Sequence, residues 1–438
     1  MEYNKLKHQY SEFIYKDYEI EKHGNKLSIT YNFEISNLIT FNPTWEFVVS
    51  KDYDEEVLNL LVFNLGMVEL VSYWKCVCSE KVIIKAGNLT FNQAKWWKKL
   101  YFNGLGEFFF VNKITTNYND FMDLQVNNQK GSKLIISNDY HGTLVPIGGG
   151  KDSNVSLELL KSLGEDITTF SINRTAAISN VIAISEVEKD ILITRNLDKK
   201  LFNLNKEGYL NGHTPFSAIV AFSSYLSAYL NGIRFISLSN ESSANEATVL
   251  NSNVNHQYSK SFEFENDFNN YMQDILISPI HYFSLLRGMN EIQIAAHFAK
   301  YKQYHQSFRS CNVGSKTGVW CNNCPKCLFV YIILSPFLTN EELNNIFHED
   351  LLAKLSLEKY FRELIGIDEN KPFECVGTRK EVLAALGNLV KNKRLSSLVL
   401  KYQDYILNHY VEIDDLLNHY NSDNLIPERF LKIYELDR

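Results

Sequence analysis

Alternation of hydrophobic and polar positions divides the first part of the chain into short elements. β-Branched and aromatic residues alternate with polar ones in some stretches, and apolar residues recur at spacings of three and four in others. The pattern predicts strands over 27–33 and 107–111 and helices over 55–75 and 92–101. Because the polar stretch 127–132 is typical of a linker, we expect residues 1–138 to form an N-terminal α+β domain.

From Thr143 the pattern changes to apolar runs that alternate with helical periodicity. The expected order is a strand, a helix from Asp152, two further strands, a long apolar helix and a last strand. The runs that predict these strands and the long helix are 143–147, 167–172, 191–194, 215–230 and 234–239. Alternation of this kind is typical of a parallel sheet with helices on both faces and a ligand site at the carboxyl ends of the strands. We expect this second domain to span residues 139–300.

The remainder, residues 301–438, predicts helices rich in Leu and Ile over 341–361 and 380–420. We expect these helices to pack onto the sheet. No residue in that last helical stretch indicates chemistry.

Composition excludes several classes of protein. The chain has 438 residues, of which 45% are apolar and 22% charged, as in an ordinary globular protein of two or three domains. A net charge of −7 with interspersed acids and bases disfavours nucleic-acid binding. No uninterrupted apolar run approaches the length of a membrane span, and the N-terminus lacks the features of a secretory signal. We therefore expect a cytoplasmic protein with no membrane partner.

Three consecutive glycines, Gly148, Gly149 and Gly150, lie between an expected strand and an expected helix. Glycine permits backbone conformations that other residues avoid and leaves no side chain in the path of an approaching phosphate. The amides and the dipole of the following helix favour an anion. Lys151, Asp152 and Ser153 follow directly, so the spacing fits neither a dinucleotide fingerprint nor a Walker loop. The structural alternative is that the glycines form a tight turn and that Asp152 and Ser153 only cap the helix.

Four of the seven cysteines are clustered as C-x9-C-x2-C-x2-C, namely Cys311, Cys321, Cys324 and Cys327. Four thiolates at this spacing predict structural Zn²⁺ with no open coordination position, and an iron–sulfur cluster is the alternative. The other three cysteines, Cys76, Cys78 and Cys375, are dispersed, and we expect each to pack in the core.

The glycine loop resembles the Ser-Gly-Gly-x-Asp-Ser loop of the PP-loop ATP-pyrophosphatases, with Gly148 in place of the first serine. This resemblance implies a Rossmann-like α/β fold of the adenine-nucleotide alpha-hydrolase (HUP) type and cleavage of ATP to AMP and pyrophosphate. The 7-cyano-7-deazaguanine synthases, which belong to the same group, carry a similar four-cysteine zinc site late in the chain. That likeness supports both motifs together.

A wider resemblance, from about residue 40 to 377, is to the UDP-N-acetylmuramoyl-L-alanyl-L-glutamate epimerases. It rests on segments spread along the chain: 66–75, 104–108, 146–153, 210–215, 239–246, 254–260, 308–311, 320–327 and 371–377. The resemblance implies that the enzyme uses ATP and Mg²⁺ to invert the terminal glutamate of a UDP-muramoyl dipeptide. Trp45, Tyr73, Trp74 and Lys75 of the N-terminal domain are then candidates for contact with the UDP-sugar.

The resemblance also implies roles for single residues. The loop residues 148–153 would hold pyrophosphate, Asp152 would also bind Mg²⁺, and Asn173 and Arg174 would receive the adenosine. Candidates for catalysis or proton transfer are Asp152, His213, Glu246 and His256, and candidates for substrate binding are Glu241, Asn245, Tyr258, Lys260, Arg287 and Arg309. Four of these candidates have a structural alternative. His213 could cap a helix or contact an anion, His256 could lie in an exposed loop, and Arg287 or Arg309 could form a structural ion pair.

Other functions remain open at this level. A PP-loop ligase or amidotransferase would pass the adenylated carboxylate to an amine or ammonia instead of water. A tRNA-modifying enzyme is disfavoured by the acidic balance, and a nucleotide sensor with a decayed loop is the alternative that is not an enzyme. The sequence gives no indication of the oligomeric state.

Overall fold

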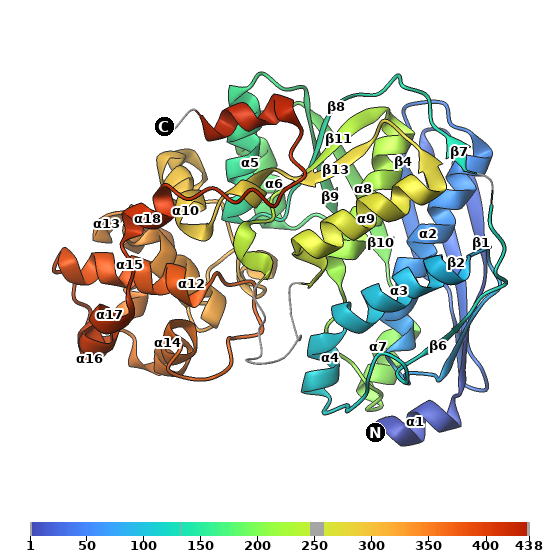
Figure 1. Cartoon of the computed structure of the whole chain (residues 1–438), viewed down its shortest axis with the longest axis horizontal. Helices are drawn as coiled ribbons and strands as arrows, with labels where there is room; N and C mark the ends of the chain where they lie inside the picture. Colours follow the sequence, from blue (N-terminus) through green and yellow to red (C-terminus); the bar gives the residue numbers. More distant parts are fainter. Residues whose placement is uncertain (1, 132, 246–257, 436–438) are drawn as a thin grey trace. The chain divides into compact units, whose positions relative to one another are not determined.

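A computed structural model describes residues 2–131, 133–245 and 258–435 (Figure 1). The chain divides into two compact units, each built from separate stretches of sequence. Unit 1 comprises residues 1–144, 191–236 and 257–282, and unit 2 comprises 145–190, 237–256 and 283–438. These units differ from the three consecutive domains expected from the sequence, because the crossings after residues 144, 190, 236 and 282 fall within β-strands and not in linkers.

The strands form a mixed sheet. Eleven described strands hydrogen-bond in the order β13-β11-β8-β9-β10-β4-β2-β1-β5-β6, with β3 paired to β2. Their bounds are β1 Glu12–His23, β2 Lys26–Ile35, β3 Ile39–Phe41, β4 Thr44–Val48, β5 Lys81–Ile84, β6 Asp123–Gln125, β8 His141–Pro146, β9 Ile167–Ile172, β10 Lys189–Asn196, β11 Ile233–Leu238 and β13 His281–Ser284. β7 (Leu134–Ile135) and β12 (Leu276–Ile277) form a separate parallel pair.

Unit 1 joins strands that the sequence assigned to different domains. β8 and β11 run parallel, with Thr143 opposite Phe235, as the alternating pattern predicts. β10 pairs antiparallel with β4 through Arg195 and Trp45. The sheet therefore continues into the N-terminal strands, and residues 1–138 are not a region of their own. Long-range pairing of this kind leaves no signal in local periodicity.

Most elements predicted for unit 1 are confirmed. Predicted strand 27–33 lies in β2, whose side chains alternate between buried and more exposed positions. The helices of this unit are α1 Tyr3–Gln9, α2 Glu55–Trp74, α3 Phe91–Gly104, α4 Gly106–Val111, α7 Lys199–Lys206, α8 Phe216–Asn231 and α9 Phe262–Ile275. Asp54 caps α2, and a capping box of Thr90 and Gln93 begins α3.

The prediction of a strand over 107–111 is wrong, because these residues form helix α4. Phe108 and Phe109 are both buried whereas Phe110 and Val111 are both exposed. Burial in consecutive pairs fits a helical face and not the alternation of a strand. Aromatic β-propensity was overridden by packing.

Of the described helices, α2 alone has the length and composition of a membrane span, with a mean hydropathy of 1.5 in its most apolar window. The protein itself buries 89% of that window, in part through contact with α8. Burial on this scale is that of a core helix.

Unit 2 carries the expected strand–loop–helix and the helical C-terminal region. Its helices are α5 Lys151–Ser162, α6 Ala176–Ser185, α10 Glu291–Lys300, α11 Gly314–Thr317, α12 Pro325–Leu334, α13 Asn340–Phe347, α14 Glu358–Ile365, α15 Arg379–Lys391, α16 Ser397–Lys401, α17 Gln403–His409 and α18 Ile413–Leu417. Helix α10 contacts α5, α12 and α15. The C-terminal helices thus reach the helix that follows the glycine loop through one intermediate.

Candidate functional site

The glycine loop adopts a conformation that requires glycine at its second position. Gly149 has a φ of 77°, and a Cβ there would lie 3.1 Å from the Ala177 side chain and 3.2 Å from the Ile178 nitrogen. A Cβ on Gly148 would meet no atom within 4 Å. The structure therefore has room for a serine side chain at position 148, whereas a side chain at position 149 would be strained by both its φ and its neighbours.

Helix α5 begins without a side-chain cap. Its N-cap residue is Gly150, which has no side chain to accept from the first-turn amides. The first backbone N–H groups of a helix have no partner within the helix, so they and the helix dipole favour an anion in front of them. The anion predicted from the sequence would lie at this helix terminus.

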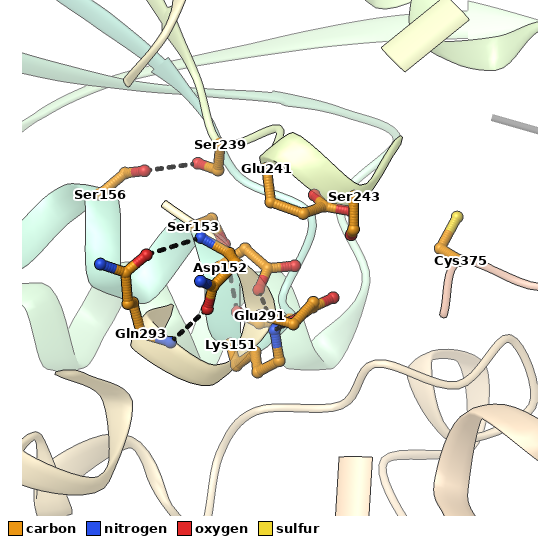
Figure 2. A network of polar contacts seen from close by, with 12 residues as sticks. Lys151, Asp152, Ser153, Ser156, Ser239, Glu241, Ser243, Glu291, Gln293 and Cys375 are labelled. Atoms are coloured by element: carbon orange, nitrogen blue, oxygen red, sulfur yellow. Dashed lines mark hydrogen bonds and ion pairs between the residues drawn. The ribbon is translucent and has the colours of Figure 1, made fainter. Parts of the chain in front are cut away.

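Lys151 lies at the centre of a charged network next to this terminus (Figure 2). Its side chain is 1% exposed, and its ammonium contacts the carboxylates of Asp152 and Glu291. Burial alone would lower the pKa of Lys151, but these two carboxylates raise it. Burial, together with the nearby Asp152 and Glu241, raises the pKa of Glu291 to about 8 against the opposing charge of Lys151. The network therefore contains more carboxyl groups than ammonium groups at the Lys151 side chain.

Glu241 follows β11 and faces the same network (Figure 2). It is 5% exposed, and the Ser243 hydroxyl donates to its carboxylate over 3.2 Å. The fully buried Arg287 donates to the Glu241 backbone carbonyl over 2.6 Å. Arg287 thus fixes the segment that carries Glu241, which is a structural contact within the site. At the same strand end, Ser239 and Ser156 of α5 are hydrogen-bonded over 2.8 Å.

Arg309 and Ser310 support the glycine loop from the segment before the first cysteine. The Arg309 backbone N–H donates to the Gly149 carbonyl over 2.8 Å. Its guanidinium donates to the carbonyls of Phe308 and Gly318 at 2.6 and 3.0 Å. The Ser310 hydroxyl lies 3.2 Å from where a Cβ of Gly150 would stand. In this structure the hydrogen bonds described for Arg309 are therefore made to backbone carbonyls, which it stabilises.

Asn173 and Arg174 follow β9, as predicted. Asn173 has a φ of 48°, which turns the chain sharply after the strand. The Arg174 guanidinium pairs with both carboxylate oxygens of Asp190, at 2.6 and 2.7 Å, and with the Ser171 hydroxyl. An adenosine ligand would meet Arg174 in this paired state.

The four clustered cysteines converge. Their sulfur atoms all lie within 4.8 Å of one another, with Cys327 3.5 Å from Cys321 and 3.4 Å from Cys324. The Gly314 N–H donates to the Cys311 sulfur over 3.0 Å, and the Cys327 N–H to the Cys324 sulfur over 3.4 Å. Such N–H donors stabilise thiolates. The cluster can hold one metal ion.

Comparison with known proteins identifies the family of the chain. The family model for the MurL N-terminal domain matches residues 4–285, and that for the MurL C-terminal domain matches 306–409. The chain belongs to the MurL family. Two relatives, from Salinispora tropica and Xanthomonas oryzae pv. oryzae, are each 34% identical to it and are named UDP-N-acetyl-alpha-D-muramoyl-L-alanyl-L-glutamate epimerase. The first alignment covers 77% of this chain and 75% of the relative, and the second covers 74% and 73%.

Further candidates of this MurL chain lie in unit 1. The His213 Nδ1 atom is 3.1 Å from a carboxylate oxygen of Glu107. Tyr258 is 6% exposed, and its burial raises the pKa of the phenol to about 12. Tyr258–Lys260 form a 3-10 turn, and Lys260 at its end is half-buried. Trp45, Tyr73, Trp74 and Lys75, expected near the UDP-sugar, are all buried.

Some predicted residues cannot be placed. Glu246 and His256 lie outside the described residues, and Asn245 is described only as the end of a 3-10 turn that begins at Ser242. Among the dispersed cysteines, Cys76 and Cys78 are buried as expected. The expectation of a core position is wrong for Cys375, which is only half-buried because its loop lies beside the network of unit 2 (Figure 2).

Sequence reasoning missed two residues of this network: Glu291, which contacts Lys151, and Glu381, which accepts from the Glu291 backbone N–H. Glu291 opens α10 soon after β13, much as Lys151 opens α5 after β8. Its position after a strand of the same sheet was the available signal. The capping box of Thr378 and Glu381 was also visible in the sequence, but a capping box indicates only a helix start.

Proposed function

We propose that the chain is an ATP-dependent epimerase that inverts the terminal L-glutamate of UDP-MurNAc-L-Ala-L-Glu to D-glutamate. One observation carries the proposal: a chain of the MurL family places an uncapped helix N-terminus, a glycine at positive φ (Gly149) and a lysine among carboxylates at one site. The names of the relatives support the substrate, and the loop geometry supports the use of ATP.

The need for ATP follows from acidity. The α-proton of a free amino-acid carboxylate is hardly acidic, because its removal places a second negative charge beside the first. Transfer of AMP to the carboxylate neutralises that charge and gives an activated acyl group, whose enolate forms far more readily. ATP then serves to acidify a carbon atom.

The proposed reaction has three steps: adenylation, inversion and hydrolysis. A carboxylate oxygen of the glutamate attacks the α-phosphorus of ATP, and pyrophosphate leaves. The α-proton is removed from one face and a proton is returned to the other. Water then cleaves the acyl-adenylate and releases AMP with the inverted product. In the net reaction, ATP and water are consumed and AMP and pyrophosphate are formed.

Residues of unit 2 serve the first step. The amides at the start of α5 and the ammonium of Lys151 stabilise the charge that develops on the departing pyrophosphate. Asp152 and Glu241 offer the hard oxygen ligands that Mg²⁺ prefers. Lys151 is charged at neutral pH, since its carboxylate partners raise its pKa.

Inversion needs two groups or one mobile group. His213, Glu246 and His256 remain the candidates for proton transfer. At a pKa of about 12 the Tyr258 phenol stays protonated at neutral pH, so it is suited to donate a hydrogen bond or a proton rather than to act as the base.

The four cysteines fit structural Zn²⁺. Four zinc–sulfur bonds of about 2.3 Å in tetrahedral geometry place the sulfurs about 3.8 Å apart. The separations of 3.4 and 3.5 Å are close to that value, whereas an iron–sulfur cluster inserts its own atoms between the thiolates. The role we propose for the ion is to clamp the chain around Cys311 next to the loop that Arg309 supports. The cytoplasm is the compartment we propose for the reaction.

The direct test incubates the purified protein with ATP, Mg²⁺ and the L-glutamate precursor. We expect D-glutamate in the hydrolysed product and AMP in the nucleotide fraction. AMP accompanied by a new amide and no D-glutamate would indicate a ligase or amidotransferase instead.

A further inference from the structure

Lys151 is held by a residue far along the chain. Its ammonium contacts Asp152, its neighbour, and Glu291, which opens α10 and is only 2% exposed (Figure 2). Asp152 is 31% exposed and can turn toward solvent or a ligand, whereas the buried Glu291 cannot. The orientation of the lysine side chain therefore depends mainly on Glu291.

Glu291 is itself fixed by a third carboxylate. The Glu291 backbone N–H donates to Glu381 over 2.7 Å. The other oxygen of the Glu381 carboxylate accepts from the backbone N–H and the hydroxyl of Thr378, at 2.5 and 2.7 Å. Glu381 is 2% exposed, so one buried carboxylate joins the first turns of α10 and α15. Helix α15 belongs to the C-terminal region in which the sequence indicated no chemistry.

We infer that Glu291 and Glu381 are positioning residues for Lys151, which together aim its ammonium at the phosphate-binding end of α5. The inference rests on the proposed function, because it assigns a task to the lysine that would contact pyrophosphate. Glu381 fixes the position of the first residue of α10, which is Glu291, and the Glu291 carboxylate then fixes the orientation of the Lys151 side chain. The C-terminal helices thereby become part of the phosphate site.

The surrounding charge distinguishes this role from simple neutralisation. Asp152 already supplies one negative charge to Lys151, so the lysine does not need Glu291 as a counter-ion. Burying an additional carboxylate is costly unless it is compensated. A protein that needed only stability would gain more from an uncharged residue at position 291.

The test measures the affinity for inorganic pyrophosphate by calorimetry in the presence of Mg²⁺. Glu291→Ala should weaken binding by tenfold or more, the order expected for a lost charge-assisted contact. Glu291→Gln should recover part of that loss, because its amide oxygen still accepts from Lys151. Glu381→Gln should also weaken binding, since an amide cannot accept at both ends as the carboxylate does.

A double-mutant cycle then separates positioning from general damage. If Glu291 acts through Lys151, Glu291→Ala should change the affinity less than about twofold in a Lys151→Ala background. Glu69→Gln is the matched control: Glu69 is equally buried and pairs with Arg195 in unit 1 at 2.9 Å. This control should leave the affinity for pyrophosphate unchanged even where it lowers thermal stability.

The outcomes are distinguishable. Full additivity of the Lys151 and Glu291 substitutions, or unchanged affinity in Glu291→Ala, overturns the inference and leaves the proposed function standing. Coupled effects without any D-glutamate formation support the inference and contradict the epimerase. Failure of the unaltered protein to bind pyrophosphate contradicts both.

Discussion

Lys75 in unit 1 and Lys151 in unit 2 are both buried lysines, and their partners differ. Lys75 in unit 1 is 6% exposed and donates to two neutral oxygens, the Gly212 carbonyl and the Thr214 hydroxyl. Burial lowers the pKa of Lys75 to about 8. Lys151 in unit 2 is fully buried, yet its carboxylate partners raise its pKa.

Burial lowers the pKa of both lysines, and the charge of the partners decides whether the net shift is downward or upward. Lys75 is an internal hydrogen-bond donor whose charge is costly to the fold. Lys151 keeps its charge beside the carboxyl groups of Asp152 and Glu291, which suits the proposed binding of Mg²⁺ and pyrophosphate. The predictions below test each side of this contrast.

The largest effect is expected from Asp152→Ala. It removes one partner of Lys151 and the proposed Mg²⁺ ligand, so AMP formation should fall by roughly a hundredfold or more. The rate of AMP release with ATP and the L-glutamate precursor measures the change. Asp166→Ala removes a 56%-exposed carboxylate of the same unit and should leave that rate unaltered. Undiminished turnover in Asp152→Ala would refute its role.

Loss of the four-thiol site should come next. Cys327→Ser should abolish stoichiometric metal binding, measured by elemental analysis, and lower the melting temperature of the protein. Because Arg309, just before Cys311, supports Gly149, the affinity for pyrophosphate should fall as well. Cys78→Ser, at a buried thiol of unit 1, should retain the metal. Full metal content in Cys327→Ser would show that the four thiols are not its ligands.

The pKa of Lys75 predicts a pH dependence of stability. The folded-state pKa of about 8 lies below the ordinary value of 10.5, so between these values the unfolded chain binds more protons. Stability should therefore rise with pH across this window, by roughly 3 kcal/mol in total. Urea denaturation at a series of pH values should show this rise in the unaltered protein and not in Lys75→Met. A rise of equal size in both proteins would exclude Lys75 as its source.

The smallest effect is expected from Thr214→Val, which removes one neutral acceptor of Lys75. Because a pKa of about 8 leaves Lys75 charged at pH 7, the loss should be about 1.5 kcal/mol of unfolding free energy, the lower end for a hydrogen bond to a charged group. Urea denaturation at pH 7 measures it. A loss several times larger would indicate that the Thr214 hydroxyl does more than accept from Lys75.

Local patterns in the sequence were sufficient for the loop and the thiol cluster. The positive φ of Gly149 favours glycine locally, and the cysteines are clustered within 17 residues, so both features are visible within a short window. Capping boxes such as Thr90 with Gln93 likewise fixed helix starts locally.

The missed features depend on contacts between distant residues. Glu291 meets Lys151 across 140 positions, and Glu381 meets Glu291 across 90. The pairing of β10 with β4 joins Arg195 to Trp45 and merges two expected domains into one sheet. Helix α4 was missed because Phe108 and Phe109 pack on one side, which a run of aromatic residues does not reveal.

The central claim is that this chain uses ATP to make the glutamate α-carbon exchange its proton. The most direct measurement is a reaction in heavy water with the L-glutamate precursor, with and without ATP, analysed by mass spectrometry. We predict one deuterium at the α-carbon of the D-glutamate product, together with AMP, only when ATP is present. AMP formation without deuterium in the product, or deuterium uptake without ATP, would contradict the account.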